Sequence, residues 1–206
     1  MTKPKETSDS LAHALVEPAH VVVPARRRTA SDYAALALAT CGVGLIPLAP
    51  GTWGSAVGVL LYLALGRAAE RVFDYEVARG LDLSPQTFPV FLTTTLLAAI
   101  LVVSLAGIWA ATRAEKLLGK KDPGAVVVDE VAGQLIAFLF VPWRAGVWAV
   151  VAAFVAFRLF DIWKPYPVRR LEGLGGGLGI MADDILAGFY AAALMSLLIA
   201  IHTISS

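Results

Sequence analysis

Residues 83–112 contain no charged side chain. Within them, Phe88 to Ala111 is long enough to cross a bilayer, because a membrane-spanning helix needs about 20 apolar residues. The 206-residue chain is 58% hydrophobic and 16% charged, whereas soluble domains contain about 25% charged residues. A chain of this size has a limited interior in which to bury such an excess of apolar side chains. We therefore expect an all-α membrane protein.

The other apolar stretches are interrupted. Residues 33–66 lack charge but contain Pro47, Pro50 and several glycines, which do not continue a helix. We predict helices at 33–46 and 55–66 around a loop at membrane depth, which is tolerated where protein or water surrounds it. Residues 67–87 are polar, and we expect a loop or an amphipathic surface segment there.

Two later stretches predict a hairpin and a final span. Segments 131–143 and 145–157 are each too short to cross the bilayer, so we expect a hairpin that dips in and returns. Ile185 to Ile201 is about long enough to cross, and its small residues are spaced for close helix contact. The predicted fold is a polytopic membrane helical bundle with short re-entrant or hairpin helices over residues 31–206. Residues 1–30 lack the apolar run that is typical of a secretory signal, so we do not expect one there and instead expect a disordered tail.

Composition also excludes several classes of function. The net charge of +1 offers no basic field for a nucleic-acid partner. A single cysteine, Cys41, excludes an intramolecular disulfide and a multi-cysteine metal site. The three histidines lie in the N-terminal tail and near the C-terminus, so a histidine nucleophile or general base is not expected.

Acidic residues lie at the edges of the apolar stretches, where a carboxylate is costly and is usually kept for a function. If residues 88–111 cross the membrane, the hairpin begins and ends on the face where that helix stops, and the last helix begins on the same face. The two polar segments on this face, 113–130 and 158–184, carry eight Lys and Arg, against three in 67–87. The positive-inside rule places this face in the cytoplasm, and we expect the 33–46 segment to lie in the interface or to re-enter.

Carboxylates that converge on one face predict a site for Mg²⁺ or a similar hard cation. The basic residues Arg158 and Lys164 would then neutralise an anionic group such as a phosphate. Gly175 to Gly177 would let backbone N–H groups approach that group. The expected chemistry is attack by a water that the metal activates.

Each feature taken singly has a simpler explanation. Asp129 and Asp183 could be helix N-caps, Arg158 and Asp161 could form a plain ion pair along one helix, and the glycine run could be only a flexible connection. The prediction depends on their convergence on one face, which separate caps and pairs do not require.

Four separate motifs resemble the phosphatidylglycerophosphatase A family. They are Gly44 to Gly54, Asp122-Pro-Gly with Val128 to Gln134, Phe157 to Val168, and Gly176 to Gly188. They occur in order and cover about residues 33–200. The resemblance implies a Mg²⁺-dependent phosphatase of the bacterial inner membrane, with several membrane passes and a cytoplasmic site. It would convert phosphatidylglycerophosphate into phosphatidylglycerol, with that phospholipid and the surrounding membrane lipids as its partners.

The resemblance and the residue chemistry together give the predicted site. The predicted metal ligands are Asp129, Glu130, Asp161, Asp183 and Asp184. The predicted catalytic residues are Asp129, Glu130, Asp161, Asp183 and Lys164. The predicted substrate-binding residues are Arg158, Lys164, Thr52, Gly176 and Gly177.

Two other functions remain open from the sequence. The same acids and the broken helix near Pro47 could line the pathway of an ion or proton-coupled transporter, although the acids cluster at one face. A phosphotransferase acting on a nucleotide-activated lipid is the weaker alternative, because no compact Asp-rich motif is present. The sequence leaves the oligomeric state undetermined.

Overall fold

The structure is a computed structural model that describes residues 27–84, 86–171 and 173–205. In these residues it is all-helical, as predicted. The predicted tail lies mostly outside the described residues, but Thr29 already caps the first helix. The helices are α1 (Ala30–Thr40), η1 (Val43–Leu45), α2 (Pro50–Ala78), α3 (Thr87–Leu118), α4 (Val128–Ala137), α5 (Val147–Trp163), α6 (Val168–Leu171) and α7 (Gly176–Ser205).

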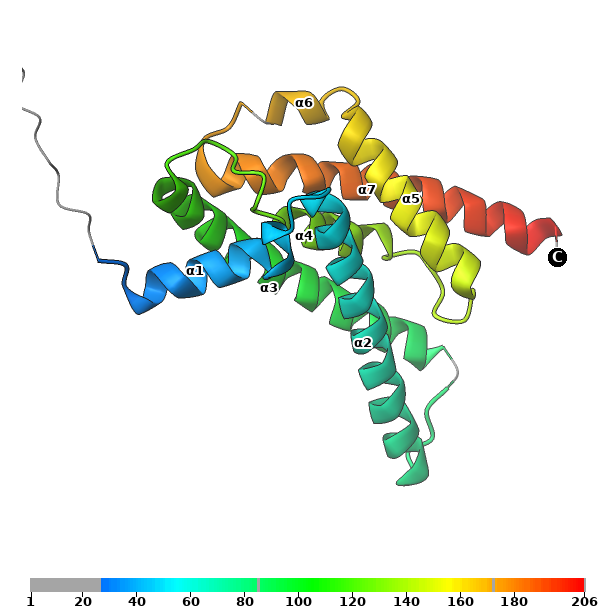
Figure 1. Cartoon of the computed structure of the whole chain (residues 1–206). Helices are drawn as coiled ribbons and strands as arrows, with labels where there is room; N and C mark the ends of the chain where they lie inside the picture. Colours follow the sequence, from blue (N-terminus) through cyan, green and yellow to red (C-terminus); the bar gives the residue numbers. More distant parts are fainter. Residues whose placement is uncertain (1–26, 85, 172, 206) are drawn as a thin grey trace, which may run out of the picture.

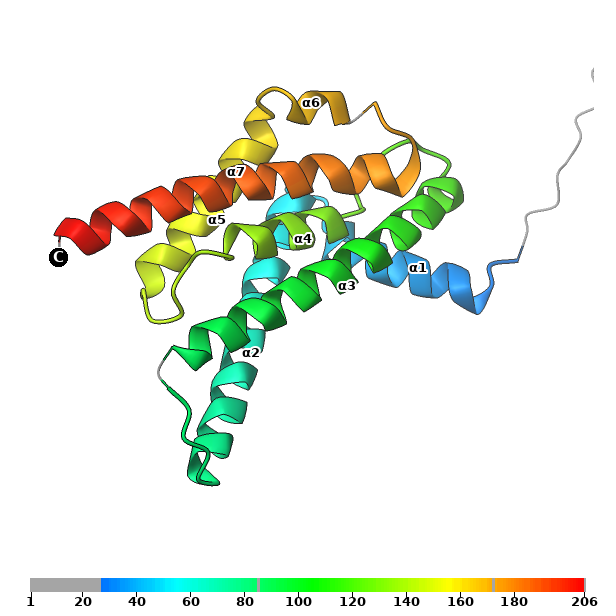
Figure 2. The ribbon, with the colours of Figure 1, turned by 180° about the vertical axis from the view of Figure 1, so that it is seen from behind.

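The short helix α4 lies in the centre of the molecule, with α2, α3 and α7 around it (Figures 1 and 2). Nine of its ten residues are buried. Small residues let the neighbouring helices approach it closely: a Cβ at Gly188 of α7 would lie 2.5 Å from the carbonyl oxygen of Gly133. The predicted close contact through small residues of the last helix is therefore present.

Two helices, α3 and α7, are long and apolar enough to cross a membrane. The end of α3 lies beside the start of α7 (Figure 2), where the amide of Gly177 donates a hydrogen bond to Thr112 Oγ1 at 2.9 Å. The end of one apolar helix and the start of the other are therefore adjacent, as the prediction of a shared face requires.

The predicted hairpin is present as α4 and α5, joined by residues 138–146. Aromatic packing supports its turn, where the rings of Tyr62 and Phe138 stack with centroids 4.0 Å apart. The helix α5 continues beyond the predicted residue 157 to Trp163. As a result, Arg158 and Asp161 lie on the last turns of a helix and not in a loop.

The predicted boundaries of two further helices are wrong. The second helix does not end at residue 66 but continues to Ala78, because its charged residues are good helix formers and Arg67 pairs with Glu70 one turn away. It also begins earlier, at Pro50, since proline suits the first position of a helix. The last helix begins at Gly176 and not at residue 185, because packing of the glycines on α3 outweighs their low helix propensity.

Candidate active site

Asp129 and Glu130 lie in the first turn of α4, where the positive end of the helix dipole favours carboxylates. The N-cap of this helix is Val127, and no side chain caps it. Asp129 is therefore not an N-cap residue. The start of α4 is held in place by a hydrogen bond from the amide of Val127 to the carbonyl of Ala39, 2.8 Å long.

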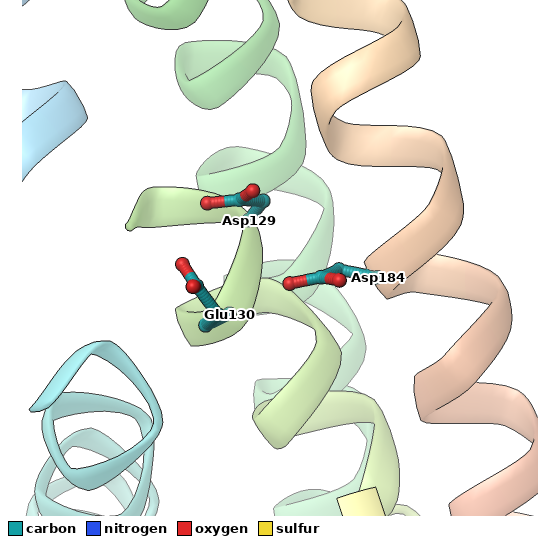
Figure 3. A group of neighbouring side chains, drawn as sticks. All are labelled: Asp129, Glu130 and Asp184. Carbon is teal, nitrogen blue, oxygen red and sulfur yellow. The ribbon is translucent and has the colours of Figure 1, made fainter. Parts of the chain in front are cut away.

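Asp183 and Asp184 come from α7, which packs along α4. Because α7 begins at Gly176, both residues lie about two turns inside the helix, so Asp183 is not an N-cap either. Both are buried. Asp184 extends toward the first turn of α4 (Figure 3), and oxygens of Asp129, Glu130 and Asp184 all lie within 4.8 Å of one another.

The remaining charged residues surround these three acids. Arg158 of α5 donates a hydrogen bond to the carboxylate of Asp161, three residues further along the helix. Lys164 caps the end of α5 with a left-handed backbone, and its Nζ donates to Asp183 Oδ2 at 2.7 Å. The predicted i,i+3 ion pair is thus present, but it lies next to the acidic cluster.

Several carboxylates therefore share one small, partly buried volume. Asp161 interacts electrostatically with Glu130 and Asp184, and Asp183 with Asp129. Asp129 Oδ1, Glu130 Oε2 and Asp183 Oδ1 are buried without a hydrogen-bond partner among the described residues. Like charges this close repel one another unless protons or a cation neutralise them. Oxygen-only donors with free lone pairs fit a hard divalent cation such as Mg²⁺ or Ca²⁺.

The predicted substrate-binding residues are placed differently from one another. Thr52 is exposed in the first turn of α2, beside Gly51, which lies against the site. Gly176 and Asp183 line one small cavity of about 20 Å³, which is enough for a single water. Gly177 packs on the backbone of α3, and its amide already donates to Thr112. Substrate contact by these residues stays a prediction.

The sequence interpretation placed Thr52 in the site but missed how closely the first turn of α2 approaches the acids. A Cβ at Gly51 would contact Glu130 Oε1 and would lie 3.0 Å from Arg158 Nη1, and a Cβ at Gly54 would lie 2.9 Å from the carbonyl oxygen of Val127. These glycines let α2 approach the acids closely. The signal was available, because Gly51, Gly54 and Gly58 have the same helical spacing of small residues as the last helix.

Gln134 was also missed. It lies one turn after Glu130 in α4, is completely buried, and neither polar atom of its amide has a partner in the part of the chain that the structure describes. Its stem packs where a Cβ at Gly58 would lie, 2.7 Å from the Gln134 Cβ. The polar interior therefore extends one turn deeper than the acidic cluster.

A much larger cavity lies elsewhere, between α2, α3 and the turn after α4. It has a volume of about 730 Å³ and is lined mainly by apolar side chains such as Phe73, Phe88 and Trp143. None of the five candidate acids lines it. We place the chemistry at the acidic cluster, because buried unpaired carboxylates indicate function more directly than the volume of a cavity does.

Comparison with known proteins identifies the family to which the chain belongs. Residues 36–199 match the sequence profile of the family "Phosphatidylglycerophosphatase A". A Bacteroides thetaiotaomicron protein named "Putative phosphatidylinositol-3-phosphatase" is 40% identical over 75% of this chain and 86% of its own length. The "Phosphatidylglycerophosphatase A" of Haemophilus influenzae is 37% identical over 73% of this chain and 78% of its own.

The "Phosphatidylglycerophosphatase A" of Escherichia coli is 30% identical over 75% of this chain and 76% of its own length. No solved structure matches the chain. The family match spans α1 to α7 and includes each of the candidate acidic and basic residues. The chain belongs to the phosphatidylglycerophosphatase A family.

Proposed function

We propose that the protein is a lipid phosphatase that hydrolyses phosphatidylglycerophosphate to phosphatidylglycerol and inorganic phosphate. The observation that carries the proposal is the buried cluster of Asp129, Glu130 and Asp184 beside two cationic side chains. The names of the Haemophilus influenzae and Escherichia coli relatives supply the substrate. The relatives named here are described as phosphatases, so the transporter alternative has no support.

We assign Mg²⁺ as the metal. Asp129, Glu130 and Asp184 would hold it, with Asp161 and Asp183 at the edge of the same cluster. The free lone pairs of Asp129 Oδ1 and Glu130 Oε2 support this assignment. When bound, Mg²⁺ supplies polarisation of the phosphoryl oxygens and activation of a water.

The chain's own residues perform the rest of the reaction. Lys164 and Arg158 neutralise the incoming phosphate monoester, which weakens their present pairs with Asp183 and Asp161. One carboxylate of the cluster takes the proton of the attacking water. The new P–O bond forms in line as the bond to the glycerol oxygen breaks, and that oxygen leaves with a proton as phosphatidylglycerol.

A second substrate deserves the same test, because the Bacteroides thetaiotaomicron relative at 40% identity carries the name of a phosphatidylinositol 3-phosphate phosphatase. Both lipids present a phosphate monoester on a diacylglycerol-linked head group. They differ in the polyol, which the charged site would contact only weakly. We favour phosphatidylglycerophosphate, because the family and two relatives carry that name.

The decisive experiment is a phosphate-release assay with both lipids, with Mg²⁺ and with chelator. We expect release from phosphatidylglycerophosphate that requires the metal. Asp129→Asn and Asp183→Asn should each reduce release by at least about a hundredfold while the protein stays folded. Asp82→Asn, on an exposed loop residue, is the matched control and should retain activity. Metal-independent release, or full activity in both variants, would contradict the proposal.

We further propose that the site faces the cytoplasm from the bacterial inner membrane and that the chain crosses it more than once. The two apolar helices and the bacterial relatives support a membrane protein. The excess of Lys and Arg on the side of the acidic cluster supports the orientation.

A further inference from the structure

The connection from α1 together with the first turn of α2, residues 41–54 (the α1–α2 segment), presents large apolar side chains outward, next to the charged site. Leu48 is 77% exposed, Leu45 is 72% exposed and Trp53 is 46% exposed. The same segment reaches the acids, because Gly51 lies against Glu130 and Arg158. Large apolar side chains beside a charged site are costly in water and indicate contact with another apolar phase.

Hydrogen bonds and the backbone conformation of the segment hold these side chains outward. The segment folds into the single turn η1, where the amide of Ile46 donates to the carbonyl of Val43 at 3.0 Å. Trp53 Nε1 donates to the carbonyl oxygen of Leu48 at 3.1 Å. Ala49 has a left-handed backbone with φ of 50°, and Gly44 packs against the carbonyl of Ala125. Leu48 is therefore held on the outside by fixed contacts and does not cover the protein core.

The end of α5, about one turn beyond Arg158, presents a second group of apolar side chains outward. Ile162 is 73% exposed and Trp163 is 64% exposed. Arg158 and Asp161 of the same helix pair with one another, and Arg158 Nη1 would lie 3.0 Å from a Cβ at Gly51 of the α1–α2 segment. Beyond Trp163, Tyr166 is exposed and lies under the guanidinium of Arg170, 4.8 Å from the ring centroid. Aromatic and basic residues in this combination are typical of a membrane interface.

We propose that the α1–α2 segment and the end of α5 form the two walls of a lipid portal, through which the substrate slides sideways from the bilayer into the site. The portal walls are Leu45, Leu48, Trp53, Ile162 and Trp163. The occupant is a phospholipid with a phosphate monoester in its head group. Its acyl chains contact the apolar walls, and its phosphate reaches Arg158 and Lys164. This inference rests on the proposed function, and it adds the route by which the lipid enters the site.

The combination of apolar portal walls with charged site residues favours a lipid over a soluble phosphate ester. A soluble ester needs only the cations and the acids. The apolar walls increase the binding affinity only of a molecule with hydrocarbon next to its phosphate. The favourable free energy of burying apolar surface is proportional to the area buried, and a soluble ester buries little. The portal therefore predicts that its walls affect long-chain substrate in vesicles and leave a short-chain, water-soluble substrate unaffected.

The test compares Leu48→Ser and Ile162→Ser with wild type on two forms of phosphatidylglycerophosphate. One is the dioleoyl form in vesicles and the other is the dihexanoyl form, dissolved as monomers. Each variant should lose about tenfold in kcat/KM on the vesicle substrate, which is the loss expected for one apolar side chain. On the dihexanoyl substrate we expect the rate to stay within about twofold of wild type.

Val147→Ser is the matched control, because Val147 is 79% exposed on the same helix as Ile162 but at its opposite end. It should leave both rates unchanged. Equal loss on both substrates would mean that the walls support the catalytic geometry, and no loss on either would mean that the lipid enters elsewhere. Either result overturns the portal.

A readout without turnover separates the portal from the proposed function. Trp53 and Trp163 should be quenched by phospholipid brominated near its carbonyl groups, and Trp53→Phe and Trp163→Phe should each remove part of this quenching. If wild type hydrolyses neither form of the lipid, the proposed function fails while quenching still decides the portal. Unchanged quenching in both tryptophan variants would overturn it.

Discussion

Asp32 shows how a single residue ties the first helix to the bundle. It accepts hydrogen bonds from the amide and hydroxyl of Thr29, at 2.7 and 2.8 Å, and from Arg113 Nε at 2.7 Å. The Thr29 amide, followed by Arg113, lowers the pKa of Asp32 from 3.8 to about 2. Because α1 supports the start of α4 through Ala39, this ion pair contributes indirectly to the site.

The lowered pKa of Asp32 predicts a pH dependence of stability. A carboxylate whose pKa is lowered by folding stabilises the folded state at pH values above its pKa in the unfolded chain, which is near 4. This stabilisation disappears as the pH falls through the folded-state pKa of about 2. Asp32→Asn should therefore have a lower Tm than wild type at neutral pH, and the difference should shrink between about pH 4 and pH 2. Thermal unfolding in detergent across this range measures it. A difference that stays constant with pH would contradict the assignment.

The buried carboxylates, also at the scale of single residues, predict that a metal ion stabilises the folded protein. A cation that binds only the folded state raises its stability, by about 2.7 kcal/mol when its concentration is a hundred times Kd. Mg²⁺ should therefore raise the Tm of wild type, and chelator should reverse this. Asp184→Asn should abolish most of the rise, whereas Asp74→Asn on the exposed side of α2 should keep it. An equal rise in both variants would exclude the cluster as the metal site.

At the scale of elements, the close contact of α4 with α7 sets the distance between the acids. The Cβ of alanine at Gly188 would lie 2.5 Å from the carbonyl oxygen of Gly133, and backbone cannot move aside as a side chain end can. Gly188→Ala should cost about 1–3 kcal/mol of stability. It should also reduce activity, because Asp184 lies one turn before it and would move away from Asp129.

The control for this contact is Gly124→Ala. An added Cβ there meets nothing within 4 Å, so both Tm and phosphate release should stay at the wild-type values. Measurement of both quantities in both variants tests the contact. If Gly188→Ala has the Tm and the activity of wild type, then the α4–α7 spacing does not determine the geometry of the acids.

At the scale of the whole molecule, the orientation in the membrane is directly testable. In a Cys41→Ser background, Asp82→Cys reports the loop between α2 and α3, and Lys120→Cys reports the segment after α3. We expect a membrane-impermeant maleimide to label Asp82→Cys in intact cells and Lys120→Cys only after permeabilisation, as the positive-inside rule requires. The reverse pattern would place the candidate site outside the cytoplasm.

The sequence alone predicted the helical class, the long span at 88–111, the hairpin and the acids at the ends of apolar stretches. These features follow from local composition, because a run of apolar residues or a pair of prolines acts over a few residues of chain. Local rules failed at α2, where charged residues continue the helix to Ala78, and at α7, where glycines begin a helix nine residues early.

Only the tertiary structure decided which acids meet. The sequence presented Asp129 and Asp183 as equally suitable for capping or for chemistry, and the same spacing of small residues appeared in α2 and α7. The packing of α7 on α4 joins Asp184 to Asp129 and Glu130, and it pairs Asp183 with Lys164. The distance between side chains that are 54 or 55 positions apart in sequence depends on how closely two helices pack, and no local pattern encodes that distance.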